Sequence, residues 1–425
     1  MKKMISLLLP VLLLASCASK SSLPTERQML QMLDKKDFFQ LETLLEKKKP
    51  ELSQDVNLYL KARLQNVFNQ TEQSLQTINV LLGNYDKSLN DTLLRNVFLI
   101  KYDNLHKQSR YREAAEALET AKDKYGYTMD SVSLANLQET YNTVEPLKEL
   151  PPQKMHLTAD VTIPISRNQF SHMVMRVTSG GQSEDFIFDT GAMLSVVSES
   201  CAQRMGIRVL ESSVNVGSSV GGQVQSKIGV ADSLRIGDLL LENVAFLVLP
   251  DEKLSFPEVN YVIHGIIGFP VVYQMKKIVM CKDEITVVAN PTKRNLHNLF
   301  LDGLSPFVRL EADSDTVVFK MDTGANTSEF SEKYFTANKD KITKKAVLKT
   351  VKRGGAGGIV DSKVYELKNV RLKIGGRELT IPSMAALTDK LSFIENCDGN
   401  LGQDVLMHFN KLILNFEDMY LAFED

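Results

Sequence analysis

Two copies of one tetrapeptide are the part of this sequence best suited to chemistry. Asp189-Thr190-Gly191-Ala192 recurs later in the chain as Asp322-Thr323-Gly324-Ala325. Each copy follows a short apolar run, at 186–188 and at 317–321. An Asp that closes a strand, with Gly two positions later, places a carboxylate on a tight loop whose backbone suits glycine. The sequence therefore predicts two carboxylates in equivalent loops.

Further landmarks repeat at nearly the same offset as the tetrapeptide, which indicates an internal duplication. Three more pairs of segments keep this offset to within one position: Gly221-Gly222 and Gly354-Gly355, Gly265–Gly268 and Gly399–Gly402, and Lys277–Val279 and Lys411–Ile413. Val, Ile, Phe and Thr are frequent throughout this part, and Gly pairs separate short apolar runs, which is typical of strands. We predict two homologous β lobes, at residues 155–290 and 298–425.

The whole constellation resembles the aspartic peptidases, and specifically retropepsin-like lobes, over all of the predicted β part. Pepsins carry both lobes in one chain, and this chain resembles that arrangement. The resemblance implies that Ile266–Gly268 and Asn400–Gly402 cross under the catalytic loops. It also implies that four glycines lie at the tips of two flaps: Gly221, Gly222, Gly354 and Gly355.

The resemblance further implies that Asp189 and Asp322 are catalytic. Two carboxylates too close to ionise together share one proton, so that one activates a water and the other polarises the scissile carbonyl. The sequence leaves open which Asp takes which role. Thr190, Gly191, Thr323 and Gly324 would support the dyad, the threonines by hydrogen bonds across the lobe junction and the glycines by backbone contacts. The alternative is a peptide-binding scaffold with a relic cleft and no turnover.

Residues beside the two motifs affect the pH range in which the dyad would be active. Pepsin-like enzymes usually carry Ser or Thr directly after Asp-Thr-Gly, whereas Ala192 and Ala325 cannot donate a side-chain hydrogen bond. A donor to a carboxylate lowers its pKa, so the resemblance predicts a mildly acidic to neutral working range. Strand alternation places Lys320 on the same side as Asp322, where it would either lower the pKa of the pair or mark a solvent-facing edge.

The elements that precede the lobes are predicted to be helices. In residues 26–150, apolar side chains recur at helical spacing, and three such sets follow one another at a nearly regular interval. This interval resembles that of tetratricopeptide-like helical hairpins. The segment would either bind a protein partner or cap the next domain, and Pro151-Pro152 marks its end. We therefore expect an α+β multidomain protein, with an all-α helical-hairpin domain followed by a bilobed all-β aspartic-peptidase fold.

The first residues are typical of a targeting segment. Lys2 and Lys3 precede an apolar run at 5–14 that is too short to span a bilayer, which indicates a signal peptide at 1–16. Leu14–Cys17 resembles a bacterial lipobox, which implies lipidation of Cys17 and a tether at 17–25. We expect a lipid-anchored protein of the bacterial cell envelope, in the outer membrane and facing the periplasm or the surface.

The composition of the chain argues against several other classes of protein and site. The chain has 425 residues and a net charge of −2, without the basic surplus of a nucleic-acid-binding protein. Its four Cys form no CxxC pair and its six His form no HExxH motif, so we expect no metal site and no cofactor. We interpret Cys201 as a structural thiol, with Cys281 a candidate partner, rather than as a nucleophile. The expected partner is a peptide or protein substrate.

Overall fold

The computed structural model describes residues 23–424 apart from 218–221, 356–357, 392–393 and 395. The predicted signal peptide, the expected lipidation site Cys17 and the predicted flap residue Gly221 lie outside the described residues. No helix in the described part of the chain is both long enough and apolar enough to cross a membrane.

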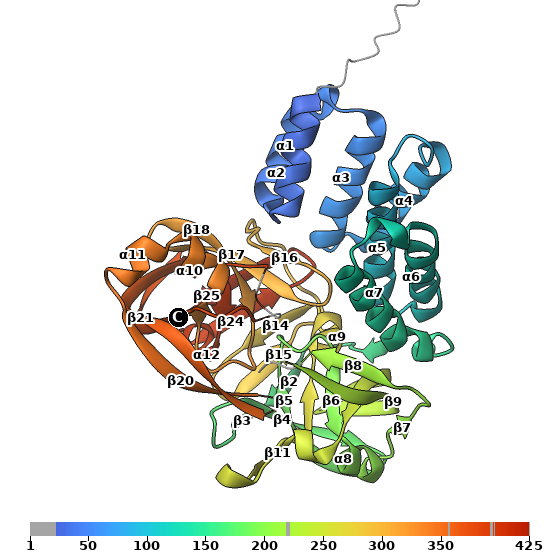
Figure 1. Ribbon diagram of the computed structural model, residues 1–425. Coiled ribbons are helices and arrows are strands. Elements are labelled where there is room, and N and C mark those ends of the chain that lie inside the picture. The colour runs from blue at the N-terminus through green and yellow to red at the C-terminus, as the bar shows by residue number, and fades with distance from the viewer. Residues whose placement is uncertain (1–22, 218–221, 356–357, 392–393, 395, 425) are drawn as a thin grey trace, which may run out of the picture.

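The N-terminal part is a helical region that ends at Leu147 (Figure 1). Its seven longer helices are α1 (Leu23–Asp34), α2 (Phe38–Lys48), α3 (Gln54–Val67), α4 (Thr71–Asn84), α5 (Asp91–Lys107), α6 (Tyr111–Tyr125) and α7 (Ser131–Val144). Helix α1 begins inside the segment expected to be a tether, because Pro24 is tolerated in the first turn of a helix. The Asn90 side chain accepts a hydrogen bond from the Leu93 N–H and caps α5.

A β-rich part follows and contains two sheets of similar topology. The first lobe is a ten-stranded sheet, including β4 (Met173–Ser179), β5 (Gln182–Phe188), β6 (Ser195–Ser198), β8 (Val214–Gly217), β9 (Gln223–Ile236), β10 (Leu239–Leu249) and β13 (Gly265–Ile267), with helices α8 (Glu199–Arg204) and α9 (Phe269–Gln274). The second lobe is an eight-stranded sheet, including β17 (Pro306–Ala312), β18 (Asp315–Met321), β19 (Glu329–Phe330), β20 (Val347–Gly355), β21 (Gly358–Ile374), β22 (Arg377–Leu387) and β23 (Gly399–Leu401), with helices α10 (Glu332–Ala337) and α12 (Gln403–Leu406).

The strand pairings repeat between the lobes. Strand β5 pairs antiparallel with β4 and parallel with β13, as β18 does with β17 and β23. Strand β13 also pairs antiparallel with β6, as β23 does with β19. The two lobes therefore place the ends of β5 and β18 in equivalent surroundings.

A third sheet joins the lobes. It has the order β2 (Val161–Pro164), β15 (Glu284–Val287), β14 (Lys277–Met280), β24 (Lys411–Asn415) and β25 (Tyr420–Glu424). Strand β14 of the first repeat pairs antiparallel with β24 of the second, and Ile278 faces Leu414. The two repeated tails of the sequence thus pair with each other, which fixes both lobes of one chain around a common junction.

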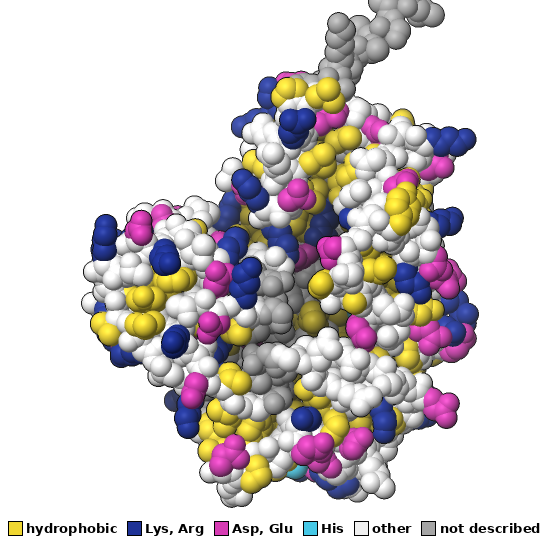
Figure 2. Space-filling view, viewed as in Figure 1, with side chains coloured by type: hydrophobic (Ala, Val, Ile, Leu, Met, Phe, Trp, Pro, Cys, Tyr) yellow, Lys and Arg dark blue, Asp and Glu magenta, His cyan; other side chains and the backbone are white. Residues whose placement is uncertain are grey.

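The helical region packs on both lobes (Figure 1). Phe38 and Phe39 of α2 share an apolar cluster with Phe300 and Phe307 of the second lobe. The partly buried carboxylate of Asp302 forms ion pairs with Lys36 and Arg63, and the Arg63 nitrogen is 2.6 Å away. Figure 2 shows Lys and Arg side chains along the hollow between the helices and the β-rich part.

On the first lobe, α7 lies against β8. Leu137 shares an apolar cluster with Val214 and Val224, and the Asn215 N–H donates to Glu139 at 3.2 Å. Of the two roles considered for the helices, these contacts agree with a cap packed on the next domain. The order of a helical region followed by β sheets confirms the predicted α+β multidomain class.

Candidate active site

Both Asp residues stand directly after a strand and are held there by a neighbouring strand. Asp189 follows β5, and its N–H donates to the Ile267 carbonyl of β13 at 3.0 Å. Asp322 follows β18, and its N–H donates to the Leu401 carbonyl of β23, also at 3.0 Å. The apolar-Gly segments expected to cross under the catalytic loops therefore contact the backbone of the Asp residues.

The two loops are joined by reciprocal hydrogen bonds between buried threonines. The Thr190 N–H donates to Thr323 Oγ1 at 3.0 Å, and the Thr323 N–H donates to Thr190 Oγ1 at 3.1 Å. Each hydroxyl in turn donates to the opposite strand end: Thr190 Oγ1 to the Met321 carbonyl at 3.1 Å and Thr323 Oγ1 to the Phe188 carbonyl at 2.9 Å. Both side chains are fully buried, so these bonds are shielded from water.

The glycines of the motifs bring the two carboxylates together. The Gly191 N–H donates to Asp189 Oδ1 at 2.7 Å, and the Gly324 N–H donates to Asp322 Oδ1 at 2.9 Å. A Cβ added to Gly191 would lie 2.5 Å from the Asp322 carboxyl carbon, and one added to Gly324 would lie 2.4 Å from Asp189 Oδ2. Each carboxylate therefore lies against the loop of the opposite lobe, in a space that only glycine leaves open.

Burial and mutual repulsion perturb this pair. Burial, and then the negative charge of Asp322, raise the pKa of Asp189 to about 7, although the Gly191 N–H and the Lys320 ammonium oppose the shift. One carboxyl of such a pair holds a proton near neutral pH while the other is ionised, which is the state that acid–base chemistry on a water requires.

Two polar side chains of the second lobe reach this site. The Asn400 side-chain N–H donates to Asp322 Oδ2 at 3.1 Å, and the Lys320 ammonium donates to the Gly191 carbonyl at 2.9 Å. Lys320 is buried, so it does not mark a solvent-facing edge. Sequence reasoning missed the role of Asn400. The offset between the repeats aligns Asn400 with Ile266, and a polar residue at an otherwise apolar position was the available signal.

The predicted flaps correspond to hairpins of different length. Gly222 lies just before β9, which pairs with β8 from Gly217↔Gln223 to Val214↔Ser226. Gly354 and Gly355 end β20, which pairs along its whole length with β21. In the second hairpin, Arg353 makes two hydrogen bonds to the buried carboxylate of Glu329 on β19, one of them 2.7 Å long. This ion pair ties the second hairpin to the sheet beneath it.

Other candidate groups lie apart from the dyad. Cys201, Cys281 and Cys397 are free thiols, so the considered Cys201–Cys281 pairing is absent from the structure. Burial raises the pKa of Cys201 to about 11, which disfavours the thiolate that a nucleophile needs. Among the described residues, no group of three or more His, Cys, Asp or Glu side chains is arranged to hold a metal.

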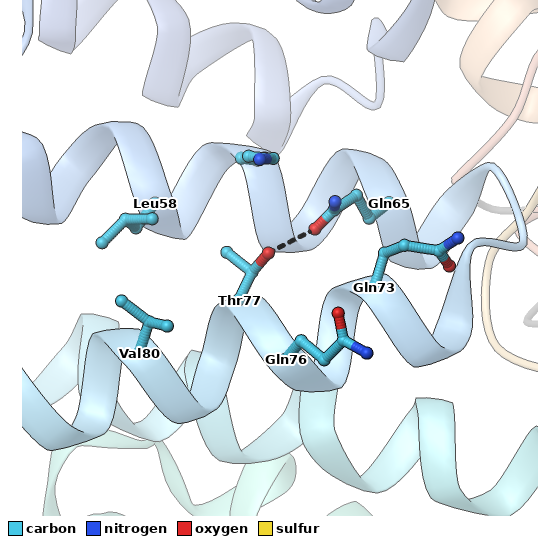
Figure 3. Close-up of a pocket in the computed structure, with 7 residues that line it drawn as sticks. Leu58, Gln65, Gln73, Gln76, Thr77 and Val80 are labelled. Carbon is cyan, nitrogen blue, oxygen red and sulfur yellow. Dashed lines mark hydrogen bonds between the residues drawn. The ribbon is translucent and has the colours of Figure 1, made fainter.

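A surface pocket lies between α3 and α4 of the helical region (Figure 3). Amide side chains line much of it, and Thr77 Oγ1 donates to Gln65 Oε1 at 2.7 Å across it. Lys61 is the ionisable residue among those that line it, and the Thr77 hydroxyl is already bonded to Gln65.

Comparisons with known proteins agree with the geometry of the first lobe. No curated protein matches the chain. Residues 175–271, which run from within β4 to within α9 and include Asp189, match the model of the family described as aspartyl protease.

Proposed function

We propose that this protein is an aspartic endopeptidase whose dyad consists of Asp189 and Asp322. The observation that carries the proposal is that each carboxylate lies against the glycine of the opposite loop. A Cβ added to Gly191 or Gly324 would be only 2.5 or 2.4 Å from the opposite carboxylate. Two carboxyls that share one partly buried space can hold a single proton between them. The aspartyl protease family match at 175–271 supports peptide-bond hydrolysis.

In the proposed reaction, the ionised carboxylate removes a proton from a water, whose oxygen attacks the peptide carbonyl carbon. The protonated carboxyl gives its proton to the carbonyl oxygen, so that a neutral tetrahedral diol forms. The first carboxyl then passes its proton to the amide nitrogen as the C–N bond breaks. The second recovers a proton from the diol, and the dyad returns to its starting state with one proton.

We also propose the surroundings in which this reaction takes place. Cys17 would be lipidated after removal of residues 1–16, and the enzyme would face the periplasm or the surface from the outer membrane. The helical region would position protein substrates or partners relative to the cleft. Because α7 contacts the β8–β9 hairpin, a partner that binds the helices would reach one flap directly.

The test is cleavage of a peptide library and of denatured casein, with products identified by mass spectrometry. The wild type should cut internal bonds, and Asp189→Asn should lower kcat/KM by at least about 1,000-fold, since it removes an acid–base group. Asp185→Asn is the matched control, because this exposed carboxylate on the same strand pairs with Arg176 at the surface. Equal turnover in the wild type and Asp189→Asn would exclude Asp189 as a catalytic group, and no turnover in the wild type would favour the alternative of a peptide-binding scaffold.

A further inference from the structure

The two carboxylates receive different sets of hydrogen bonds. Asp189 Oδ1 accepts from the N–H groups of Gly191 and Ala192, at 2.7 and 3.2 Å. Asp322 Oδ1 accepts the equivalent pair from Gly324 and Ala325, at 2.9 and 3.1 Å. The backbone donors therefore match between the lobes, and the difference lies at the other oxygen.

That difference is the side chain of Asn400, whose N–H donates to Asp322 Oδ2 at 3.1 Å. Asn400 pairs with Lys320 in the sheet of the second lobe, as Ile266 pairs with Ile187 in the first. The counterpart of Asn400 is therefore Ile266, which has no group to donate to Asp189. Asn400 is 2% exposed, so water does not compete with this bond.

The orientation of the Asn400 amide is linked to the charge of Asp322. Its Oδ1 is buried and has no hydrogen-bond partner. Turning the amide over would bring this oxygen against the Asp322 carboxylate, where two acceptors face each other unless Asp322 carries a proton. The observed orientation therefore matches an ionised Asp322, because a donor favours the charged form of a carboxylate.

Other charged and titratable groups act on the same pair. The Lys320 ammonium, on β18, favours the ionised form of Asp189 and works against Asn400. His172, before β4, interacts with Asp322, but burial lowers the pKa of His172 and the charge of Arg167 on β3 (Ser166–Arg167) adds to that effect. The pKa of Asp189 remains above its ordinary value in spite of Lys320.

We propose that Asn400 is a positioning residue that assigns the two roles in the dyad: it holds Asp322 as the carboxylate and leaves the proton on Asp189. If the proposed peptidase function holds, Asp322 takes the proton from the water and Asp189 gives its proton to the carbonyl oxygen. The assignment itself is a property of the free protein and can be tested without a substrate.

The test uses the full chain labelled with carbon-13 at the Asp carboxyls and titrated by NMR from pH 3 to 9. This range includes the pKa of Asp189, which is about 7. The Asp189→Asn and Asp322→Asn variants assign the two signals. In the wild type, in the state in which the dyad holds one proton, the Asp189 signal should be that of a protonated carboxyl and the Asp322 signal that of a carboxylate. In Asn400→Ile, which gives the second lobe the residue of the first, the ratio of the two proton populations should fall by roughly tenfold.

A second variant moves the donor instead of deleting it. Asn400→Ile combined with Ile266→Asn should transfer the proton to Asp322, because the new donor and Lys320 would then both favour an ionised Asp189. An equal share of the proton in the wild type, or the same share in all three proteins, would overturn the proposal. A merely structural role of Asn400 would leave the share unchanged. Absence of peptidase activity would not affect this result, so the two proposals fail separately.

Discussion

The two lobes have the same backbone pairings and opposite side-chain chemistry beside the dyad. Three adjacent positions, in register across neighbouring strands, are apolar in the first lobe and polar or charged in the second: Ile187, Ile266 and Val196 against Lys320, Asn400 and Glu329. In the first lobe these side chains join an apolar cluster with Val214 and Val224 of the hairpin. In the second lobe they contact the catalytic loops and the ion-paired Arg353.

The comparison separates what places the carboxylates from what tunes them. The strand ends, the threonine bonds and the glycines are equivalent in both lobes, and they bring the two carboxylates together. The row of side chains beside them differs between the lobes. A symmetric backbone thereby supports an asymmetric pair, in which the proton has a preferred place.

The largest expected effect comes from the part that the lobes share. Gly191→Ala and Gly324→Ala should each lower kcat/KM by at least about 100-fold, because a Cβ would displace the opposite carboxylate and misplacement of a catalytic group by about 1 Å has this cost. Gly83→Ala is the control, since a Cβ at this helical position meets nothing within 4 Å. Steady-state kinetics on one peptide substrate would check this, and a loss confined to one of the two glycines would break the equivalence of the loops.

The next effect concerns the stability of the second lobe. Arg353→Val leaves the buried Glu329 carboxylate unpaired and should lower the free energy of unfolding by about 3 kcal/mol, the lower end of the usual range because Arg353 is partly exposed. The double variant Glu329→Val, Arg353→Val gives this site the apolar character of the first lobe and should recover most of the loss. Urea unfolding of the wild type and the two variants decides this, and a double variant less stable than Arg353→Val would contradict it.

A smaller effect is expected in the alkaline limb of activity. With the pKa of Asp189 at about 7, kcat/KM should fall above that pH as the dyad loses its single proton. Lys320→Ile removes a cation that lowers the pKa of Asp189, so the limb should move to higher pH by about one unit. The pH profile of kcat/KM for both proteins checks the sign, and a shift to lower pH would show that Lys320 acts mainly on another group.

The smallest expected effects are shifts of the acid and alkaline limbs of the pH profile of kcat/KM. Ala192→Ser offers a donor to Asp189 and should move the alkaline limb to lower pH, whereas Ala325→Ser offers one to Asp322 and should move the acid limb to lower pH. Each shift should be less than about one unit, because a donor to a charged group contributes at most about 1.5–3 kcal/mol and water replaces part of it. Shifts of the same limb in both variants would contradict separate roles for the two carboxyls.

Much of the fold followed from repetition in the sequence. The constant offset between the repeated motifs predicted two β lobes with a carboxylate loop in each, and the α+β class is confirmed. The apolar character around Asp189 also follows from its sequence neighbours, since Ile187 precedes it on the same strand.

The difference between the side-chain surroundings of Asp189 and Asp322 was harder to predict, because it depends on contacts between strands that are distant in the sequence. Ala192 and Ala325 indicated only that the residue after each motif offers no donor, whereas Asp322 accepts from the side chain of Asn400 on another strand. That contact joins segments far apart in the sequence and requires the parallel register of β18 with β23. The packing of the helical region on both lobes likewise depends on surfaces, such as those of Phe38 and Phe300, that periodicity identifies only as buried.

The proposed function requires that the two lobes of a single chain form one dyad. The most direct test is kcat/KM for Asp189→Asn, for Asp322→Asn and for an equimolar mixture of both, after co-refolding. We predict that each variant loses at least about 1,000-fold and that the mixture recovers nothing, because each chain contains one disabled site. Full activity in Asp322→Asn together with its loss in Asp189→Asn, or recovery in the mixture, would show that the catalytic carboxylates come from two chains and would contradict the single-chain dyad.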